Sequence, residues 1–589
     1  MSKTDDHLGQ KTKLDQPSFL KTRPGLRVRG LSAAFLCLVI GSSFGLGQSA
    51  KDNFVTPLMQ AQAMYEAKDF SGAEKLSRQI VQTNPTSEKA WSLLARSLKN
   101  LGRYDEAITT FQKVLEVGGD QPTVTMYNTA ACYALLGRKD ESLKWLERAI
   151  TAGFPYLNYL RGDDDFKTLR AEPKFKQLAL IVDVSNLSRV EGWRSDLDLI
   201  VKEMKRLHAQ LDSRRNAQER AAQEFDNAVK ALSEAIPKLS DDEIGVGFMK
   251  LLRRFGDGHT SIGFGRDNAA TAKELPVRFS LFEEGSYISQ ATKEHEDLLW
   301  ARLVSIEGKP MDEVYRTLDS VIPQDNVMTM KSRAPGMLRN LRVLKALGLA
   351  ASSDQLKLEI VDQVGNKRSV AVDAEALGPS PQWLRAPSGV NVEVPLYLRK
   401  TTDNYWFTYL ANEKTVYCQY NRCNDKPEES MSKFAERLFA FVAQNEVEKL
   451  VFDLRLNGGG DNFLDWGFWQ GCIRAAKINQ PGHLFVIAGR NTFSSAMVFA
   501  TEMDRFTNAI FVGEPTGSSP NFVGRNNVYT LPYSKMQASI ADVYWQNSHG
   551  LDYRIWISPQ IYAPPTFESY RSGKDPALEA IFSYRRDDK

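Results

Sequence analysis

The chain has 589 residues, of which 42% are hydrophobic and 25% are charged, a composition typical of a soluble globular protein with about two to four domains. Lys and Arg total 75 against 72 for Asp and Glu, so the formal net charge is only +3. Without a long basic run after the amino-terminal segment, nucleic acid is excluded as a partner class. No Cys/His spacing resembles a metal site, and the sequence predicts no metal and no other cofactor.

The chain opens with a basic segment followed by an apolar one. The basic residues are Lys21, Arg23, Arg27 and Arg29. An uncharged stretch over residues 30–50 follows, with its apolar centre at Ala33–Ile40 and the glycine-flanked segment "GLG" at 45–47. Residues 1–50 therefore fit either a cleaved signal peptide or a signal anchor that keeps residues 30–50 in the membrane. Both predict export of the rest of the chain to the periplasm or the extracellular space.

Residues 51–185 are predicted to form an all-α tetratricopeptide repeat domain. Ala73 and Ala107 are 34 residues apart, and Gly102 and Gly137 are 35 apart, which is the period of such helix pairs. A charged segment at 159–180 is expected to cap the stack. Such stacks often present a concave surface to a peptide or protein partner, although the same stack also serves as a spacer or an oligomerisation surface.

The periodicity changes at about residue 190. Residues 190–265 are expected to be helical, because apolar residues recur three and four positions apart. Residues 266–400 contain strand-like runs interrupted by a helical insertion at about 325–350. In residues 401–589 strands and helices alternate, which predicts an α/β core with a mostly parallel sheet covered by helices.

Two further features of the cysteines follow from their positions. Cys418 and Cys423 are close enough in sequence to form a disulfide in an oxidising compartment, if their geometry allows it. Cys132 falls inside a helical repeat, where a buried thiol is expected.

Three stretches carry candidate catalytic groups. "FGDGHT" places His259 after a glycine-flanked turn, and "DLRLNGGG" ends a strand in glycines, including Gly458 and Gly459, whose N–H groups can turn toward a ligand oxygen. "NTFSSAMVFA" places Ser494 and Ser495 at the start of an apolar helix. Each stretch also has a structural explanation: a structural histidine, a turn and a helix cap.

Four segments in order resemble the signature segments of the tail-specific, or C-terminal-processing, serine proteases, and especially of their tricorn-like branch. They are "LLRRFGDGHTSIGF", "VFDLRLNGGGDN", "NTFSSAMVFA" and "FVGEPTGSSP". The resemblance covers about residues 190–589 and implies a crotonase/ClpP-like fold with a ββα core. It also implies a serine endopeptidase acting on a peptide or protein substrate.

The resemblance assigns roles residue by residue. Ser494 matches the nucleophile, and His259 matches the histidine that acts as general base and then as general acid. The oxyanion donors implied are the N–H groups of Ser495 and of Gly458 or Gly459. Asp552, in "HGLDYR", is the candidate for the acidic residue that orients His259.

The sequence also departs from the family pattern. Met497 stands where the family often has glutamate, and Gln560 stands where an aspartate is expected. "GEPTGSSPNFVGR" contains no lysine, which disfavours the Ser–Lys dyad of the other branch. A second hypothesis is therefore a weak or inactive protease-like scaffold that binds peptides or apolar ligands.

Overall fold

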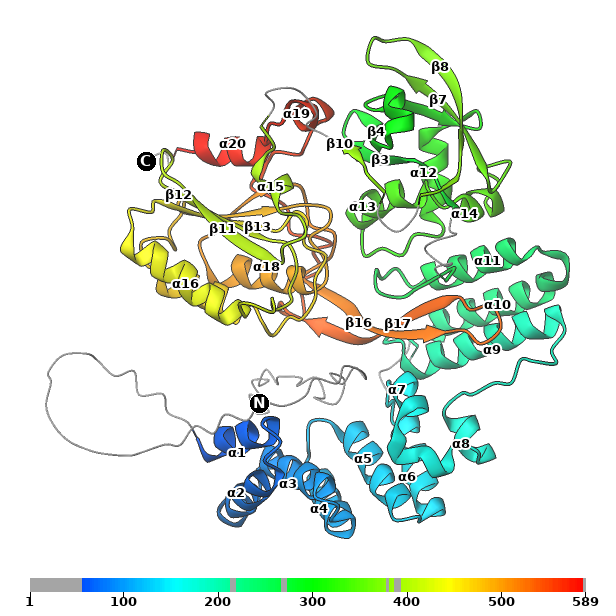
Figure 1. Cartoon of the computed structure of the whole chain (residues 1–589), viewed down its shortest axis with the longest axis vertical. Coiled ribbons are helices and arrows are strands. Elements are labelled where there is room, and N and C mark those ends of the chain that lie inside the picture. Colours follow the sequence, from blue (N-terminus) through cyan, green and yellow to red (C-terminus); the bar gives the residue numbers. More distant parts are fainter. Residues whose placement is uncertain (1–55, 212–218, 266–272, 378–380, 386–392, 586–589) are drawn as a thin grey trace, which may run out of the picture. The chain divides into compact units, whose positions relative to one another are not determined.

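The structure is a computed structural model that describes residues 56–211, 219–265, 273–377, 381–385 and 393–585 (Figure 1). The chain divides into two compact units, with the boundary between Ala179 and Leu180. The predicted export segment lies outside the described residues. None of the helices that the structure describes is long and apolar enough to cross a membrane.

The first unit is a series of helical hairpins. Its helices are α1 Pro57–Glu66, α2 Phe70–Thr83, α3 Glu88–Asn100, α4 Tyr104–Glu116, α5 Pro122–Leu135, α6 Lys139–Thr151, α7 Leu157–Gly162, the 3₁₀ helix η2 Asp164–Leu169 and α8 Pro173–Leu178. Ala73 and Ala107 are fully buried, because these small residues lie where neighbouring helices approach. Cys132 is buried with a free thiol, as expected. The predicted all-α repeat architecture is confirmed.

Three helices open the second unit: α9 Arg189–Leu207, α10 Glu219–Ala235 and α11 Asp241–Arg253. Capping boxes fix the starts of α9 and α11, where Ser188 and Ser240 exchange hydrogen bonds with the residue three positions later. After α11 the chain turns at Gly256, whose φ of +64° favours glycine, and the loop that contains His259 follows.

An antiparallel sheet follows in the described part of residues 273–385. Its seven strands are β3 Val277–Phe282, β4 Gly285–Ala291, β5 Arg302–Ile306, β6 Lys309–Pro310, β7 Gln355–Val361, β8 Lys367–Asp373 and β10 Leu384–Arg385. Helices α12 Met311–Asp319, α13 Val327–Met337 and α14 Leu341–Ala346 interrupt the strands. Helices α13 and α14 coincide with the helical insertion expected at about 325–350.

The α/β core contains a six-stranded sheet within residues 393–585, ordered β11-β12-β13-β14-β15-β18. The strands are β11 Tyr405–Leu410, β12 Thr415–Tyr420, β13 Lys449–Asp453, β14 Leu484–Ala488, β15 Ile510–Gly513 and β18 Ile561–Tyr562. All neighbouring strands pair in parallel except the antiparallel edge strand β11. The expectation of a mostly parallel sheet is confirmed.

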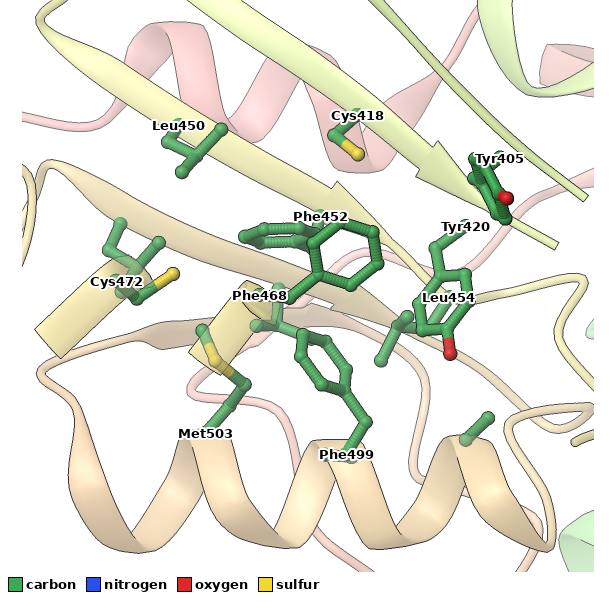
Figure 2. Close-up of a cluster of buried hydrophobic side chains, with 14 of the residues drawn as sticks. Tyr405, Cys418, Tyr420, Leu450, Phe452, Leu454, Phe468, Cys472, Phe499 and Met503 are labelled. Atoms are coloured by element: carbon green, nitrogen blue, oxygen red, sulfur yellow. The ribbon is translucent and has the colours of Figure 1, made fainter. Parts of the chain in front are cut away.

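Helices bury both faces of this sheet. On one face, Phe452 of β13 packs against Phe468 of α17 (Trp466–Arg474) and Phe499 of α18 (Ser495–Phe506), as Figure 2 shows. On the other face, Val451 of β13 belongs to a cluster with Ile581 of α20 (Pro576–Ser583). Since adjacent residues of β13 face opposite helices, the strand is apolar throughout, as buried parallel strands are.

A third sheet joins the histidine loop to the core. Its order is β1-β17-β16, with β1 Ser261–Gly263, β16 Asn521–Thr530 and β17 Gln537–Gln546. Strand β1 begins two residues after His259 and pairs antiparallel with β17. In addition, the N–H of Ala541 donates to Thr260 Oγ1 at 3.1 Å. This pairing holds the loop beside a segment that lies 281 residues later in the chain.

The predicted Cys418–Cys423 disulfide is wrong for this structure, because both thiols are free and buried. Cys418 points into the core from β12 (Figure 2), and the strand runs on in extended form to Tyr420, which carries the chain away from Cys418. The Cys423 Sγ instead lies 3.7 Å from Asn457 Oδ1.

Replacing Phe499 by alanine is expected to destabilise the second unit by about 3–5 kcal/mol, because it empties the space between α18 and the sheet. Urea denaturation followed by circular dichroism measures the loss. Phe506→Ala is the matched control on the same helix, since this ring is 39% exposed, and it should cost less than about 1 kcal/mol. Equal losses would contradict this account of the core.

Candidate active site

Ser494 and His259 lie in contact, although 235 residues separate them in the chain. The distance between His259 Nε2 and Ser494 Oγ is 3.0 Å, which is within hydrogen-bonding range. The imidazole is stacked on the ring of Phe493 at 4.5 Å and on that of Phe522 at 5.5 Å, measured between ring centroids. These two aromatic rings fix the plane of the imidazole and leave His259 only 5% exposed.

Asp257 organises the loop that carries His259. Its Oδ1 accepts hydrogen bonds from the N–H groups of His259, at 2.9 Å, and Thr260, at 2.6 Å. Its Oδ2 lies 2.9 Å from Nε2 of the buried His208 at the end of α9. Burial opposes the charge of Asp257, but these partners outweigh it and hold the pKa of the carboxyl below its usual value. Asp257 is therefore a buried negative charge beside His259.

Asp325 and Arg333 hold the loop from its other side. The N–H of Gly258 donates to Asp325 Oδ1 at 2.5 Å, and Arg333 Nη1 donates to the carbonyl of Gly258 at 2.9 Å. Burial raises the pKa of Asp325 to about 6, although Gly258 and the Ser518 hydroxyl both donate to its carboxylate. A Cβ at Gly258 would lie 2.6 Å from the ring of Phe493, so a side chain has no room there.

Burial lowers the pKa of His259 to about 4. Two charges act on it in opposite directions: Asp257 raises the pKa, whereas the guanidinium of Arg333 lowers it. An interaction with the main chain of Val523 also raises it. Because this pKa lies well below 7, the imidazole is neutral at neutral pH and Nε2 can accept a proton from Ser494.

The backbone of Ser494 is strained. Its φ of +57° and ψ of −126° lie outside the regions that L-residues ordinarily adopt. Ser494 occupies the N-cap position of α18, yet its side chain makes no capping hydrogen bond. The helix-cap explanation therefore does not account for Ser494, and its hydroxyl is directed to His259. The sharp turn from a strand loop into a helix resembles the nucleophile elbow of α/β-hydrolases.

The glycine loop lies against Ser494. A Cβ at Gly459 would be 2.6 Å from the Cβ of Ser494, and the φ of Gly459 is +107°, so this position requires glycine. The Gly459 N–H donates to Asn457 Oδ1 at 2.9 Å. The N–H groups of Gly458 and Ser495 donate to no other residue in the part of the chain that the structure describes. Of the predicted oxyanion donors, the N–H groups of Gly458 and Ser495 are therefore free to bind a ligand oxygen. Gly459 instead allows the glycine loop to approach Ser494 closely.

Asp552 does not orient His259, so its predicted role is wrong. Its carboxylate binds the guanidinium of Arg554, at 3.0 Å from Nε and 2.8 Å from Nη2, and these hydrogen bonds hold its pKa far below the usual range. Arg554 is bound in turn by Asp504 of α18, at 2.9 Å. His259 Nδ1 is buried and has no hydrogen-bond partner of good geometry among the described residues.

The two departures from the family pattern have structural roles. Met497 is a fully buried residue of α18 that packs into the core. Gln560 binds the main chain of strand β15, since its Oε1 accepts a hydrogen bond from the N–H of Phe511 at 2.7 Å. No group of three or more His, Cys, Asp or Glu side chains that could hold a metal occurs in the described ranges.

Sequence comparisons match the first unit. A family model described as "Tetratricopeptide repeat" matches residues 86–152, and one described as "Anaphase-promoting complex, cyclosome, subunit 3" matches 46–114. A chloroplastic protein of Arabidopsis thaliana is 36% identical over 89 residues, or 14% of this chain and 26% of that protein. "Intraflagellar transport protein 70A" of Danio rerio is 33% identical over 95 residues, or 16% of this chain and 14% of that protein. The chain thus matches about a quarter or less of these relatives.

Structural comparisons extend over more of the chain. Mature CPAF is 13% identical, with 67% of this chain and 96% of that chain covered and a TM-score of 0.47. The photosystem II D1 C-terminal processing protease is 12% identical, with 66% and 96% covered and a TM-score of 0.32. A putative S41 protease from Bacteroides fragilis is 13% identical, with 56% and 86% covered and a TM-score of 0.27. Because these scores lie below 0.5, the function is inferred from the geometry of Ser494 and His259 themselves.

The low pKa of His259 can be measured without any substrate. We expect its imidazole C–H resonance to titrate with a midpoint near pH 4, because burial disfavours the charged ring. Carbon–proton NMR of the full chain with labelled histidine gives the midpoint, and His259→Ala assigns the resonance among the six histidines. A midpoint at or above the ordinary value of about 6.5 would contradict the buried, neutral imidazole.

Proposed function

We propose that this protein is an exported serine endopeptidase that cleaves peptide bonds through Ser494, with His259 as its base. The observation that carries this proposal is the 3.0 Å contact between Ser494 Oγ and His259 Nε2. The strained backbone of Ser494 and the available N–H groups of Gly458 and Ser495 support it.

The chemistry follows from these positions. His259 Nε2 takes the proton of Ser494 as Oγ attacks the carbonyl carbon of the scissile bond. The N–H groups of Ser495 and Gly458 stabilise the oxygen that becomes negative, and the charge of Asp257 stabilises the imidazolium. His259 then gives the proton to the leaving amine, which leaves an acyl group on Ser494. Water, deprotonated by His259, hydrolyses this ester and restores the serine.

The repeats and the export segment complete the proposal. Tetratricopeptide repeats match residues 86–152, and such stacks recruit peptide or protein partners in many proteins. We assign the first unit the recruitment of a substrate or partner. The basic and apolar pattern of residues 1–50 supports action in the periplasm or the extracellular space, with membrane anchorage through residues 30–50 if the signal is retained.

One observation favours a second function, that of a weak or inactive scaffold that binds peptides. His259 Nδ1 has no carboxylate partner in the described residues, and replacing the triad acid of a serine protease lowers kcat by about 10⁴-fold. Asp257 argues against this second function, because its buried charge acts on the same imidazole from a neighbouring position.

Ser494→Ala is expected to lower the peptidase rate by about 10⁴-fold or more, and His259→Ala by a similar factor, because the two groups act as one unit. A casein or quenched-peptide assay measures the rate, and a fluorophosphonate probe followed by mass spectrometry locates the modified residue. Ser495→Ala keeps the main-chain N–H and should lose far less, within about tenfold. If the probe does not label the wild-type protein, and Ser494→Ala and His259→Ala leave the rate unchanged, the proposal is wrong.

Asp257→Asn is expected to lower kcat by about ten- to a hundredfold and to move the acidic limb of the pH–rate profile to lower pH. The reason is that removing the negative charge lowers the pKa of His259 and destabilises its imidazolium. The amide can still accept the N–H of His259, which preserves the loop. Asp552→Asn is the matched control and should leave the acidic limb in place; a shift in that variant alone would restore Asp552 as the acid.

A further inference from the structure

A cavity of about 290 Å³ lies at the carboxyl ends of β13, β14 and β15. Ligands of open α/β sheets bind at this edge. Leu456 and Asn491, from the loops after β13 and β14, form one wall. Leu281 and Phe282 of β3 and Ser332 of α13 line it from the antiparallel sheet and its helical insertion. The cavity is therefore lined by two regions. The α/β core also carries Ser494, and the helical insertion of the antiparallel sheet also carries Arg333, which contacts the loop of His259.

Direct contacts connect the cavity to the catalytic pair. Asn491 lies three residues before Ser494, and its Nδ2 donates to the carbonyl of Leu456 at 3.0 Å. Ser332 Oγ donates to Asn491 Oδ1 at 3.3 Å. The next residue of α13, Arg333, places its guanidinium 4.9 Å from the centre of the Phe493 ring, on which His259 stacks. One turn of α13 thus borders both the cavity and the Ser494–His259 pair.

The walls of the cavity are largely apolar. They include Phe279, Leu281, Phe282, Pro335, Ile487 and Tyr570. Two guanidinium groups also line it, but carboxylates neutralise both. Arg455 binds Asp453 and Asp575 at 2.7 and 2.8 Å, and Arg490 is bound by Glu514. A buried carboxylate or phosphate would find both guanidinium groups already paired, and the remaining cation of the lining, Lys331, is an exposed residue. An apolar group, in contrast, loses nothing by leaving water.

We propose that this cavity is the specificity site that receives a large apolar or aromatic side chain of the substrate, at a residue next to the scissile bond. The inference rests on the proposed peptidase function and names the substrate class that this site selects. The volume is at the lower end of the range of ligand pockets and holds an aromatic side chain with its flanking backbone. An apolar pocket discriminates by about 10–200-fold for each methylene that it accepts or lacks, so selection for a large side chain is strong.

Ser332→Phe tests the proposal by filling the cavity from α13. Quenched peptides that differ at a single position carry Phe, Leu, Ala or Asp there. For the wild type, kcat/KM should be highest with Phe or Leu. The variant should lose at least about tenfold on these two peptides while keeping its rate on the Ala peptide. Val327→Phe is the matched control, because Val327 lies on the same helix, is 50% exposed and does not line the cavity.

Leu281→Trp fills the cavity from β3 instead of α13 and must change the profile in the same direction, which keeps the test decisive if Ser332→Phe fails to fold. Labelling of Ser494 by a fluorophosphonate, whose small group does not need the cavity, reports the catalytic centre in every variant. Normal labelling with an unchanged profile in both variants would overturn the cavity assignment alone. So would a wild-type preference for Asp. Absence of labelling and cleavage in the wild type would overturn the peptidase function, and with it this inference.

Discussion

The buried carboxylate of Asp257 is the interaction on which the geometry of the Ser494–His259 pair depends. An ionised carboxylate inside a protein is stable only when donors surround it, and Asp257 receives the N–H groups of His259 and Thr260 and faces His208. These contacts set the course of the chain from α11 into β1. Since β1 pairs with β17, the same contacts fix where the imidazole lies relative to the α/β core. Asp257 thus acts on His259 twice, through the backbone and through its charge.

The core supplies the opposing half of the site. Ser494 keeps a strained backbone conformation because the structure on both sides of it in the chain and in space holds it there. On one side α18 is anchored by Phe499 against the sheet. On the other side Gly459 packs directly against Ser494, in a conformation that favours glycine. The hydroxyl of Ser495 donates to the carbonyl of Gly460, which ties the glycine loop to the start of the helix. The helix packing and the glycine loop thus hold the backbone of Ser494 from two directions.

Much of this arrangement could be predicted from the sequence, because local patterns carry it. The 34-residue period, the alternation of strands and helices, and the positions of Ser494 and His259 all follow from short segments. The acidic residue that acts on His259 could not be predicted. Only the structure shows that the carboxylate of Asp552 is bound by Arg554 and is therefore not directed to His259. Asp257 was visible inside "FGDGHT", but its role depends on His208 at the end of a different helix. Asp325, Arg333 and Phe522 carry no sequence signal, because tertiary packing alone brings them to the site. The disulfide failed for the same reason: nearness in sequence does not set the direction of two thiols.

A serine–histidine pair without a carboxylate on Nδ1 faces a conflict between two requirements. Deep burial keeps the imidazole neutral, which makes it available as a base over a wide pH range. It also penalises the imidazolium that forms in the proposed reaction when Ser494 attacks. A negative charge nearby relieves the penalty without direct contact, because Coulomb interactions are weakly screened inside a protein. Asp257 supplies this charge, and Arg333 partly opposes it. Burial, these two charges and the interaction with the main chain of Val523 together set the pKa of His259, and with it the strength of the base in the proposed reaction.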